Sequence, residues 1–280
     1  MIRISSYNKY EEIVKLEFQR FFNEIINKAL DPTDLLVCHQ GGFFEWSGNP
    51  CIGLGEVGLN NLQKYNYIQN IGKEITVNED DYFKKYGNSF FNGITDFEKG
   101  IIKVNNLYLD IWENEWFLRN FAEVVRIANG LHYDWNLDLS NLSSLNKSNF
   151  IREEIIKKLD KYPYFQGIIR EGYNNNFRNA IAHSQYHLVQ GGICLDNFGR
   201  DKYAITQFLS FDEWEKLVIY AWSILRFIYR CLNQLATFQF FYLSKIMSSR
   251  GIPILVPING EWQHRFIYPD KTGRTWRFIK

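Results

Sequence analysis

The sequence predicts a mainly α-helical protein that carries a small β-hairpin between helices and further α/β elements at both ends. Two observations support this fold class. Apolar side chains recur at helical spacing over long stretches, most clearly in residues 107–128 and from residue 210 onward. Short apolar runs bounded by glycine and asparagine, which are typical of strands and turns, lie between and around these stretches. We therefore expect an N-terminal region (1–105), a helical domain (106–247) and a basic, aromatic C-terminal extension (248–280).

Composition and charge limit the functions to be considered. The 280 residues are 46% hydrophobic and 17% aromatic, which is enough to form a sizeable core. The net charge of +1 argues against a protein that grips nucleic acid by bulk electrostatics. The charge is uneven, however: residues 1–100 carry −4, residues 101–250 carry +2 and residues 251–280 carry +3. A site for a polyanion is therefore expected in the C-terminal two-thirds.

The cysteine pattern and the hydropathy favour a cytoplasmic protein. The four cysteines form no CxxC pair, and no basic-then-apolar export signal opens the chain. The most apolar run, Leu217 to Leu225, is too short to span a membrane and is followed by Arg226. We therefore expect no membrane association.

A metal site is considered at Cys38, His39 and Cys51, which could supply three zinc ligands. A fourth ligand is not evident, and the spacing matches no common zinc finger. We expect no metal.

The first predicted helix covers about residues 8–30 and ends at Asp31-Pro32. Apolar residues recur within it at helical spacing and should form one buried stripe: Ile13, Leu16, Phe18, Phe21, Phe22, Ile25 and Ile26.

Residues 53–58 match the GxGxxG pattern through Gly53, Gly55 and Gly58. Such a loop can hold a pyrophosphate at a helix N-terminus when it follows a buried strand. The preceding residues, 46–50, do not resemble a buried strand, and no alternating strand and helix series follows. A glycine-rich turn is therefore expected, with no nucleotide cofactor; a cofactor-dependent enzyme stays a minor alternative.

One long helix is expected over residues 107–128, with Asn129-Gly130 as its stop signal. Its acidic residues are assigned to the solvent-exposed face: Asp110, Glu113 and Glu123. A polar loop should follow over residues 136–149, and then helices at about 150–161 and 164–171.

Residues 177–184 combine side chains that can cut RNA without a metal. Cleavage by the 2′-hydroxyl needs proton transfer, for which His183 is suited, and stabilisation of charge on the phosphate, for which the fork of Arg178 is suited. Asn179 adds an orienting amide. The turn at 172–176 should place Arg178 and Asn179 at a helix start, where free N–H groups favour an anion.

Helix geometry argues that one chain alone does not bring these groups together. Arg178 and His183 are offset by about 140° around a helix, so a helix end or a second subunit would have to close the gap. The alternative is that Arg178 is an ordinary ion-paired residue and His183 a hydrogen-bonded residue at a helix end.

The run Arg178-Asn179-Ala180-Ile181-Ala182-His183 resembles the Arg-x4-His motif of the HEPN superfamily, and the resemblance covers about residues 107–245. It implies an HEPN-like helical bundle that forms a homodimer with a composite active site. It also implies a metal-independent ribonuclease of a toxin–antitoxin or anti-phage system, in which Arg178 binds the phosphate, Asn179 orients and His183 is the acid and base. A tyrosine two residues after the histidine is common in toxins of this family; here Gln185 takes that place and Tyr186 follows, as a candidate RNA contact.

The elements after the motif complete the expected fold. Two short strands with tight turns should cover about residues 187–199. The closing helix should begin at a capping box of Ser210 and Glu213. Its sequence is apolar nearly all round, which indicates burial or a partner.

The C-terminal extension interleaves aromatic and basic residues. Aromatic rings stack on bases and cations neutralise phosphates, so Arg265, Arg274, Trp276 and Arg277 are candidate RNA contacts. The alternative is a small β-extension packed on the helices.

Two functional hypotheses follow. The first is an endoribonuclease that cleaves RNA by 2′-hydroxyl attack, acts as a homodimer and is restrained by an antitoxin or sensor protein. The second is a non-catalytic HEPN-like module that binds RNA, a nucleotide or a protein.

Overall fold

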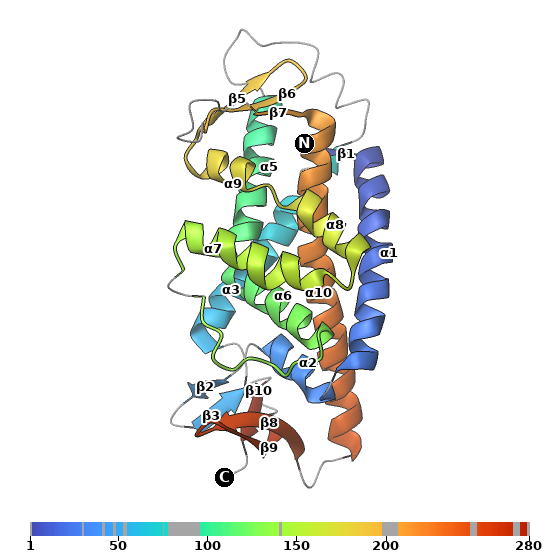
Figure 1. Ribbon diagram of the computed structural model, residues 1–280, viewed down its shortest axis with the longest axis vertical. Coiled ribbons are helices and arrows are strands. Elements are labelled where there is room, and N and C mark those ends of the chain that lie inside the picture. Colours follow the sequence, from blue (N-terminus) through green and yellow to red (C-terminus); the bar gives the residue numbers. More distant parts are fainter. Residues whose placement is uncertain are drawn as a thin grey trace. The chain divides into compact units, whose positions relative to one another are not determined.

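The computed structural model (Figure 1) describes residues 2–29, 31–40, 43–46, 49–52, 55–74, 76–77, 96–139, 142–197, 207–246, 251–270 and 275–278. Most of these residues are helical, so the predicted mainly α-helical class is confirmed. The HEPN-like form of the bundle stays a prediction.

The chain forms two compact units, and each unit is built from three separate segments. Unit 1 comprises residues 1–19, 65–114 and 162–226, and unit 2 comprises residues 20–64, 115–161 and 227–280. The three domain ranges expected from the sequence also stay a prediction.

Unit 1 is mainly helical. It contains the first part of α1 (Ile4–Lys28), the last part of α3 (Gly55–Glu74), α5 (Asp96–Glu113), α8 (Pro163–Gly172), α9 (Asn175–Ala182) and the first part of α10 (Phe211–Ile246). Strands β1 (Ile2–Arg3) and β4 (Thr76–Val77) form a parallel pair in the same unit. The indole N–H of Trp112 in α5 donates to the carbonyl of Gly172 at the end of α8, 3.2 Å away, and so ties the two helices together.

The first helix starts earlier than predicted, at Ile4, and its buried stripe is narrower. In unit 1, Val14 and Phe18 are buried, whereas Ile13 and Leu16 are exposed. In unit 2, Phe21, Phe22 and Ile25 of the same helix are buried and Ile26 is exposed. The buried side chains of α1 are therefore those that neighbouring elements cover, which are fewer than the apolar positions in its sequence.

The single helix predicted over residues 107–128 is wrong. It is two helices, α5 and α6 (Glu115–Ala128), separated by Asn114, whose N–H donates to the carbonyl of Ile111. The assignment of Glu123 to the solvent face is also wrong, because its side chain is fully buried.

Helical structure in unit 2 starts again before residue 150. Ser143 caps α7 (Ser144–Phe150) by accepting the N–H of Asn146, so the predicted loop ends six residues early. The next stretch is a π-helix, η1 (Ile151–Ile156), followed by a 3₁₀ turn, η2 (Lys157–Leu159). Its wider turn brings Ile151, Ile155 and Ile156 into the core of unit 2.

The predicted β-hairpin is present in unit 1 and gains a third strand. Strand β6 (Gly192–Leu195) pairs in antiparallel fashion with β5 (Tyr186–Val189) and β7 (Gln207–Ser210). Gly192 is required at its position, because a Cβ there would collide with the backbone carbonyl of Leu209.

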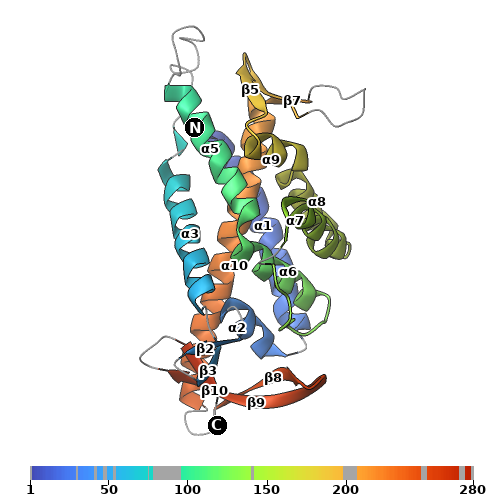
Figure 2. The ribbon, with the colours of Figure 1, turned by 90° about the vertical axis from the view of Figure 1, so that its left-hand side faces the viewer.

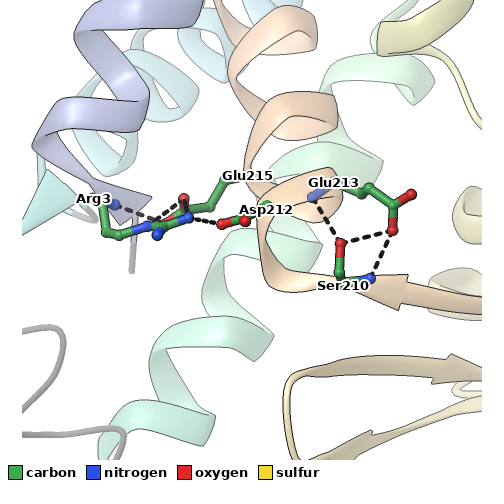
Figure 3. A network of polar contacts seen from close by, with 5 residues as sticks. All are labelled: Arg3, Ser210, Asp212, Glu213 and Glu215. Carbon is green, nitrogen blue, oxygen red and sulfur yellow. Dashed lines mark hydrogen bonds and ion pairs between the residues drawn. The ribbon is translucent and has the colours of Figure 1, made fainter.

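The predicted capping box at the start of α10 is confirmed (Figure 3). The N–H and hydroxyl of Ser210 donate to Glu213 Oε2 over 2.9 and 2.7 Å, and the N–H of Glu213 donates to Ser210 Oγ over 3.3 Å. The hydroxyl of Ser210 lowers the pKa of Glu213. One turn further, Arg3 donates from its backbone and its Nε to the buried Glu215, each over 2.8 Å, which anchors the N-terminal segment to α10.

Unit 2 combines helices with a five-stranded sheet of order β2-β3-β10-β9-β8 (Figure 2). Its helices include α2 (Pro32–Gln40), α6, α7 and the last part of α10. All described strand pairs in this sheet are antiparallel. The strands are β2 (Phe43–Trp46), β3 (Asn49–Ile52), β8 (Ile252–Ile258), β9 (Glu261–Asp270) and β10 (Thr275–Phe278).

The GxGxxG segment lies in a different context from the one predicted. A strand, β3, does precede it, and α3 begins at Gly55. Gly53 itself lies outside the described residues. Since β3 pairs in antiparallel fashion with both of its neighbours, the parallel strand and helix unit of a dinucleotide fold is not formed.

Across the residues described, no helix is both long and apolar enough to cross a membrane.

Candidate functional site

Helix α9 carries the Arg178 to His183 motif, and both of its ends are capped. At the start, the Asn174 side chain accepts the N–H of Phe177 over 2.9 Å, and the N–H of Asn174 donates to the hydroxyl of Tyr108 over 2.8 Å. The N–H of Arg178 donates to the carbonyl of Asn174 over 3.0 Å. The expectation that Arg178 offers a free N–H to an anion is therefore wrong.

The side chain of Arg178 lies in the interior of unit 1. It is 1% exposed and forms an ion pair through Nη2 with Glu113 Oε1, at the end of α5. Its Nη1 also donates to the Asn179 side-chain oxygen over 3.4 Å, a long contact. A buried guanidinium needs such partners, because the desolvation of an unpaired charge costs several kcal/mol, of the order of a whole domain's stability. Arg178 thus joins α9 to α5.

Two aromatic pairs also join α5 to the segment of α9. Phe177 packs against Tyr108 in a tilted arrangement with 5.0 Å between ring centroids, and Trp112 packs edge-on against Tyr173 at 4.9 Å. Burial raises the pKa of Tyr108, while the nearby charge of Arg178 acts in the opposite direction. Tyr108 therefore stays a neutral phenol that accepts the N–H of Asn174.

His183 lies at the other end of α9 and is exposed. Its N–H donates to the carbonyl of Asn179 over 3.0 Å, and the chain then leaves the helix through Ser184, which has a positive φ of 53°. Arg178 thus faces the core while His183 faces solvent, as the angular offset along the helix predicts. The structure brings together Arg178, Asn179 and Glu113 but leaves His183 apart from the guanidinium.

In this structure the group suited to proton transfer, His183, is exposed, whereas the group suited to binding phosphate, Arg178, is buried. His183 is open to a substrate and can exchange a proton with it. Glu113, which is 26% exposed, pairs with the buried guanidinium of Arg178. A phosphate that binds the fork of Arg178 would have to compete with this carboxylate.

The remaining RNA contacts predicted from the sequence lie in different environments. Tyr186 is half-buried in β5. Trp276 is 2% exposed, so its ring cannot stack on a base, and that part of the prediction is not supported. Arg265 lies over the ring of Phe278 at 5.7 Å, Arg277 is half-buried in β10, and Arg274 lies outside the described residues.

Of the three zinc ligands considered above, the structure describes the side chain of Cys38. Cys38 is buried in unit 2 with its Sγ 3.4 Å from the side-chain oxygen of Asn120, and burial raises the pKa of its thiol. The side chains of His39 and Cys51 lie outside the described residues. Among the described residues, no three histidine, cysteine or acidic side chains form a group that could hold a metal.

Two acidic residues that the sequence assigned to the solvent face have structural roles in the fold. Glu113 is the partner of Arg178, and Glu123 is the buried acid of unit 2. The amphipathic pattern gave no signal for either, because an acidic residue inside a helix is assigned to the wet face by default. The role of Glu113 follows from its ion pair with Arg178, 65 residues away in sequence. The burial of Glu123 is accompanied by a hydrogen bond from the N–H of Asp134.

The carboxyl group of Glu123 is held inside unit 2 beside a small pocket of about 40 Å³. Its Oε2 accepts the N–H of Asp134 over 3.0 Å. Arg126 lines the same pocket and donates through Nε to the carbonyl of His132 over 2.7 Å. Burial raises the pKa of Glu123 to about 7, and the Asp134 N–H lowers it by a smaller amount.

This pKa predicts that unit 2 loses stability as the pH rises. The folded state holds the proton of Glu123 up to about pH 7, whereas the unfolded chain releases it near 4.5. The contribution of Glu123 to the free energy of unfolding is therefore greatest below pH 4.5. It falls by about 3 kcal/mol between pH 4.5 and 7. Glu123→Gln should remove this loss, so that urea unfolding shows the variant gaining on the wild type as the pH rises from 5 to 8.

Glu261→Gln is the matched control for this prediction, because Glu261 is exposed in the same unit. The same pH dependence in Glu123→Gln and in the wild type would contradict a buried, protonated Glu123.

We also compared the chain with known proteins. No protein-family model, no curated protein and no solved structure matches this chain.

Proposed function

We propose that the protein is a metal-independent endoribonuclease whose substrate binds at the C-terminal end of α9, where His183 is exposed. The observation that carries the proposal is the arrangement of the motif on one short helix: an accessible imidazole at its end and an arginine held in its first half by Glu113 and Asn179. The resemblance of residues 178–183 to the HEPN motif supports the same reaction.

In the proposed reaction, a histidine removes the proton of a 2′-hydroxyl, and the resulting oxygen attacks the adjacent phosphorus. A second acid protonates the departing 5′-oxygen, and a 2′,3′-cyclic phosphate remains. One chain offers a single His183 at this end of α9. A homodimer in which two copies face each other would supply both the base and the acid.

Arg178 serves first as a positioning residue in this proposal. Its ion pair with Glu113 fixes α9 against α5 and thereby the place of His183 at the helix end. It contacts phosphate only in a state where a phosphate oxygen has displaced Glu113, an exchange that the planar fork of arginine suits.

Cleavage of RNA in a chelator tests the proposal. Purified protein in excess EDTA is expected to cut total RNA and a defined oligoribonucleotide, with ends that carry a 2′,3′-cyclic phosphate. The same oligonucleotide with a 2′-deoxy sugar at the cleaved position should resist, because it lacks the attacking oxygen. Efficient cutting of the deoxy substrate, or a strict need for added metal, would contradict the mechanism.

A second function, a non-catalytic module that binds RNA, a nucleotide or a protein, is favoured by one observation: Arg178 is 1% exposed and already ion-paired. This alternative predicts RNA binding with no cleavage under any condition. For the first function, the ribonuclease, we also propose that the protein is a defence or toxin effector restrained by a protein partner.

A further inference from the structure

Strand β9 carries a row of large side chains on the surface of unit 2. Trp262, Phe266 and Tyr268 are 47%, 44% and 42% exposed, and His264 between them is exposed as well. Alternate residues of a strand point to the same side of a sheet, so these four side chains form one row. The row extends over about 20 Å along the strand, at about 3.4 Å per residue.

The pairing of the strands places this row on one face of the sheet, which we call the outer face. Pro257, Leu255 and Pro253 of β8 lie directly opposite Trp262, His264 and Phe266, and Arg277 of β10 lies opposite Tyr268. Directly paired residues lie on one side of the sheet, so Arg277 belongs to the same face.

The other face contains the buried residues of the sheet, although Gln263 and Arg265 of β9 are exposed on that same face. Ile252, Ile254 and Ile267 are at most 3% exposed, and Trp276 and Phe278 of β10 are buried on that side. The outer row is therefore not explained by packing within the sheet. Three exposed aromatic rings on one strand form an apolar patch of the kind that marks a binding surface.

The orientation of the first ring is set by contacts within unit 2. The ring of Trp262 lies 5.4 Å from that of His132, and His132 Nδ1 is 3.0 Å from Asp34 Oδ2. The indole is thus partly ordered before any ligand arrives, which lowers the entropy cost of binding.

The chemistry of the face indicates what it binds. Between residues 262 and 268 the row contains no carboxylate, and it is flanked by the guanidinium of Arg277 and interrupted by the imidazole of His264. Residues 251–280 as a whole carry a charge of +3. Flat rings with nearby cations suit bases and phosphates together, because every base offers a π-face and every linkage an anion.

The spacing of the rings favours a single strand over a duplex. Alternate side chains on a strand are about 7 Å apart, twice the rise of about 3.4 Å of stacked bases. Bases that are separated from one another can therefore each lie against a ring, whereas the bases of a duplex are already stacked and paired.

We propose that the outer face of β9 binds single-stranded nucleic acid, with bases stacked on Trp262, Phe266 and Tyr268 and phosphates beside His264 and Arg277. The sequence already predicted that aromatic residues of this extension stack on bases; the structure leaves out the buried Trp276 and keeps these three exposed rings. This platform does not depend on the ribonuclease activity proposed for α9.

Fluorescence anisotropy with labelled twelve-nucleotide oligo(U) and oligo(dT) tests the platform on the full chain. Both single strands are expected to bind, and a duplex of the same length to bind much more weakly. Each single replacement, Trp262→Ala, Phe266→Ala or Tyr268→Ala, should weaken binding about tenfold, and the triple variant by more than a hundredfold. Phe266→Trp should retain binding, because it keeps a flat ring.

Phe208→Ala is the matched control, because Phe208 is an aromatic residue of similar exposure, 49%, on β7 in the three-stranded sheet of unit 1. Unchanged binding by a folded triple variant, or no binding of either strand by the wild type, would overturn the proposal. If the triple variant instead altered self-association in the absence of nucleic acid, the face would be a protein interface and the proposal would fail.

The use of oligo(dT) separates this test from that of the ribonuclease. DNA lacks the 2′-hydroxyl and cannot be cut by the proposed reaction, so its binding reports on the platform alone. A protein that binds oligo(dT) but cuts no RNA would support the platform and contradict the nuclease.

Discussion

His183→Ala is expected to reduce RNA cleavage by a factor of about 10² to 10⁴, the usual contribution of a general acid or base. The physical reason is that the imidazole is the exposed group of the motif that can exchange a proton with substrate. The fold should be unaffected, because the side chain is exposed at the end of α9, and the backbone bond to Asn179 does not involve the imidazole. Single-turnover cleavage and thermal unfolding measured on the same samples check both parts.

His187→Ala provides the matched control for this result. His187 is also exposed, lies four residues further on in β5, and pairs with Asp196 over 2.8 Å. The His187→Ala variant should therefore cut RNA at the wild-type rate. Equal losses in both variants would indicate a local change of structure rather than chemistry, and full activity in His183→Ala would show that another group transfers the proton.

Glu113→Ala is expected to destabilise the protein by about 3 kcal/mol or more, the cost of removing one partner from a buried ion pair. The change takes away the carboxylate that neutralises the guanidinium of Arg178, which is 1% exposed. Urea unfolding of unit 1 would show this as a lower midpoint at an unchanged slope. The double variant Glu113→Leu/Arg178→Met should recover most of the loss, since it removes both charges and keeps apolar volume.

The matched control here is Glu171→Ala. Glu171 pairs with Lys216 over 2.6 Å in the same unit, and both side chains are at least a third exposed. Exposed pairs contribute about 0–1 kcal/mol, so this variant should unfold almost as the wild type does. A similar small effect in Glu113→Ala would mean that the Arg178 pair is solvated and that a phosphate can reach the guanidinium directly.

This stability effect bears on the test of the nuclease. Arg178→Ala would weaken both the fold and any contact with phosphate, so a loss of activity in that variant does not assign a role. Arg178→Lys keeps the charge but loses the fork, and its activity should be compared at a temperature where both proteins are fully folded.

Several elements followed from local sequence signals alone. The capping box of Ser210 and Glu213 is formed by side chains three residues apart, so it needs nothing from the rest of the chain. The hairpin of β5 and β6 is likewise local, since its turn includes Gly191 at a positive φ of 89°. The offset of Arg178 and His183 around α9 also follows from helix geometry.

Other features could not be predicted because their determinants are distant in sequence. The apolar pattern runs on through residue 114, so it gave no sign that α5 and α6 are separate helices. The sheet of unit 2 joins β3 to β10 across more than two hundred residues, and that pairing decides which side of β9 is core. The sequence analysis treated the aromatic residues of the extension alike as possible base contacts, and only the structure shows that Trp276 is buried whereas Trp262, Phe266 and Tyr268 are exposed.

The sequence by itself determined the helical class, the capped start of α10, the hairpin, and the order of Arg178, Asn179 and His183. Tertiary structure alone decided that Glu113 faces Arg178, that Glu123 is buried, and that the aromatic row of β9 is on the surface. The physical reason is the separation in sequence between the residues that interact. Caps and turns depend on neighbours a few residues apart, whereas the burial of a charge or a ring depends on which distant segments cover it.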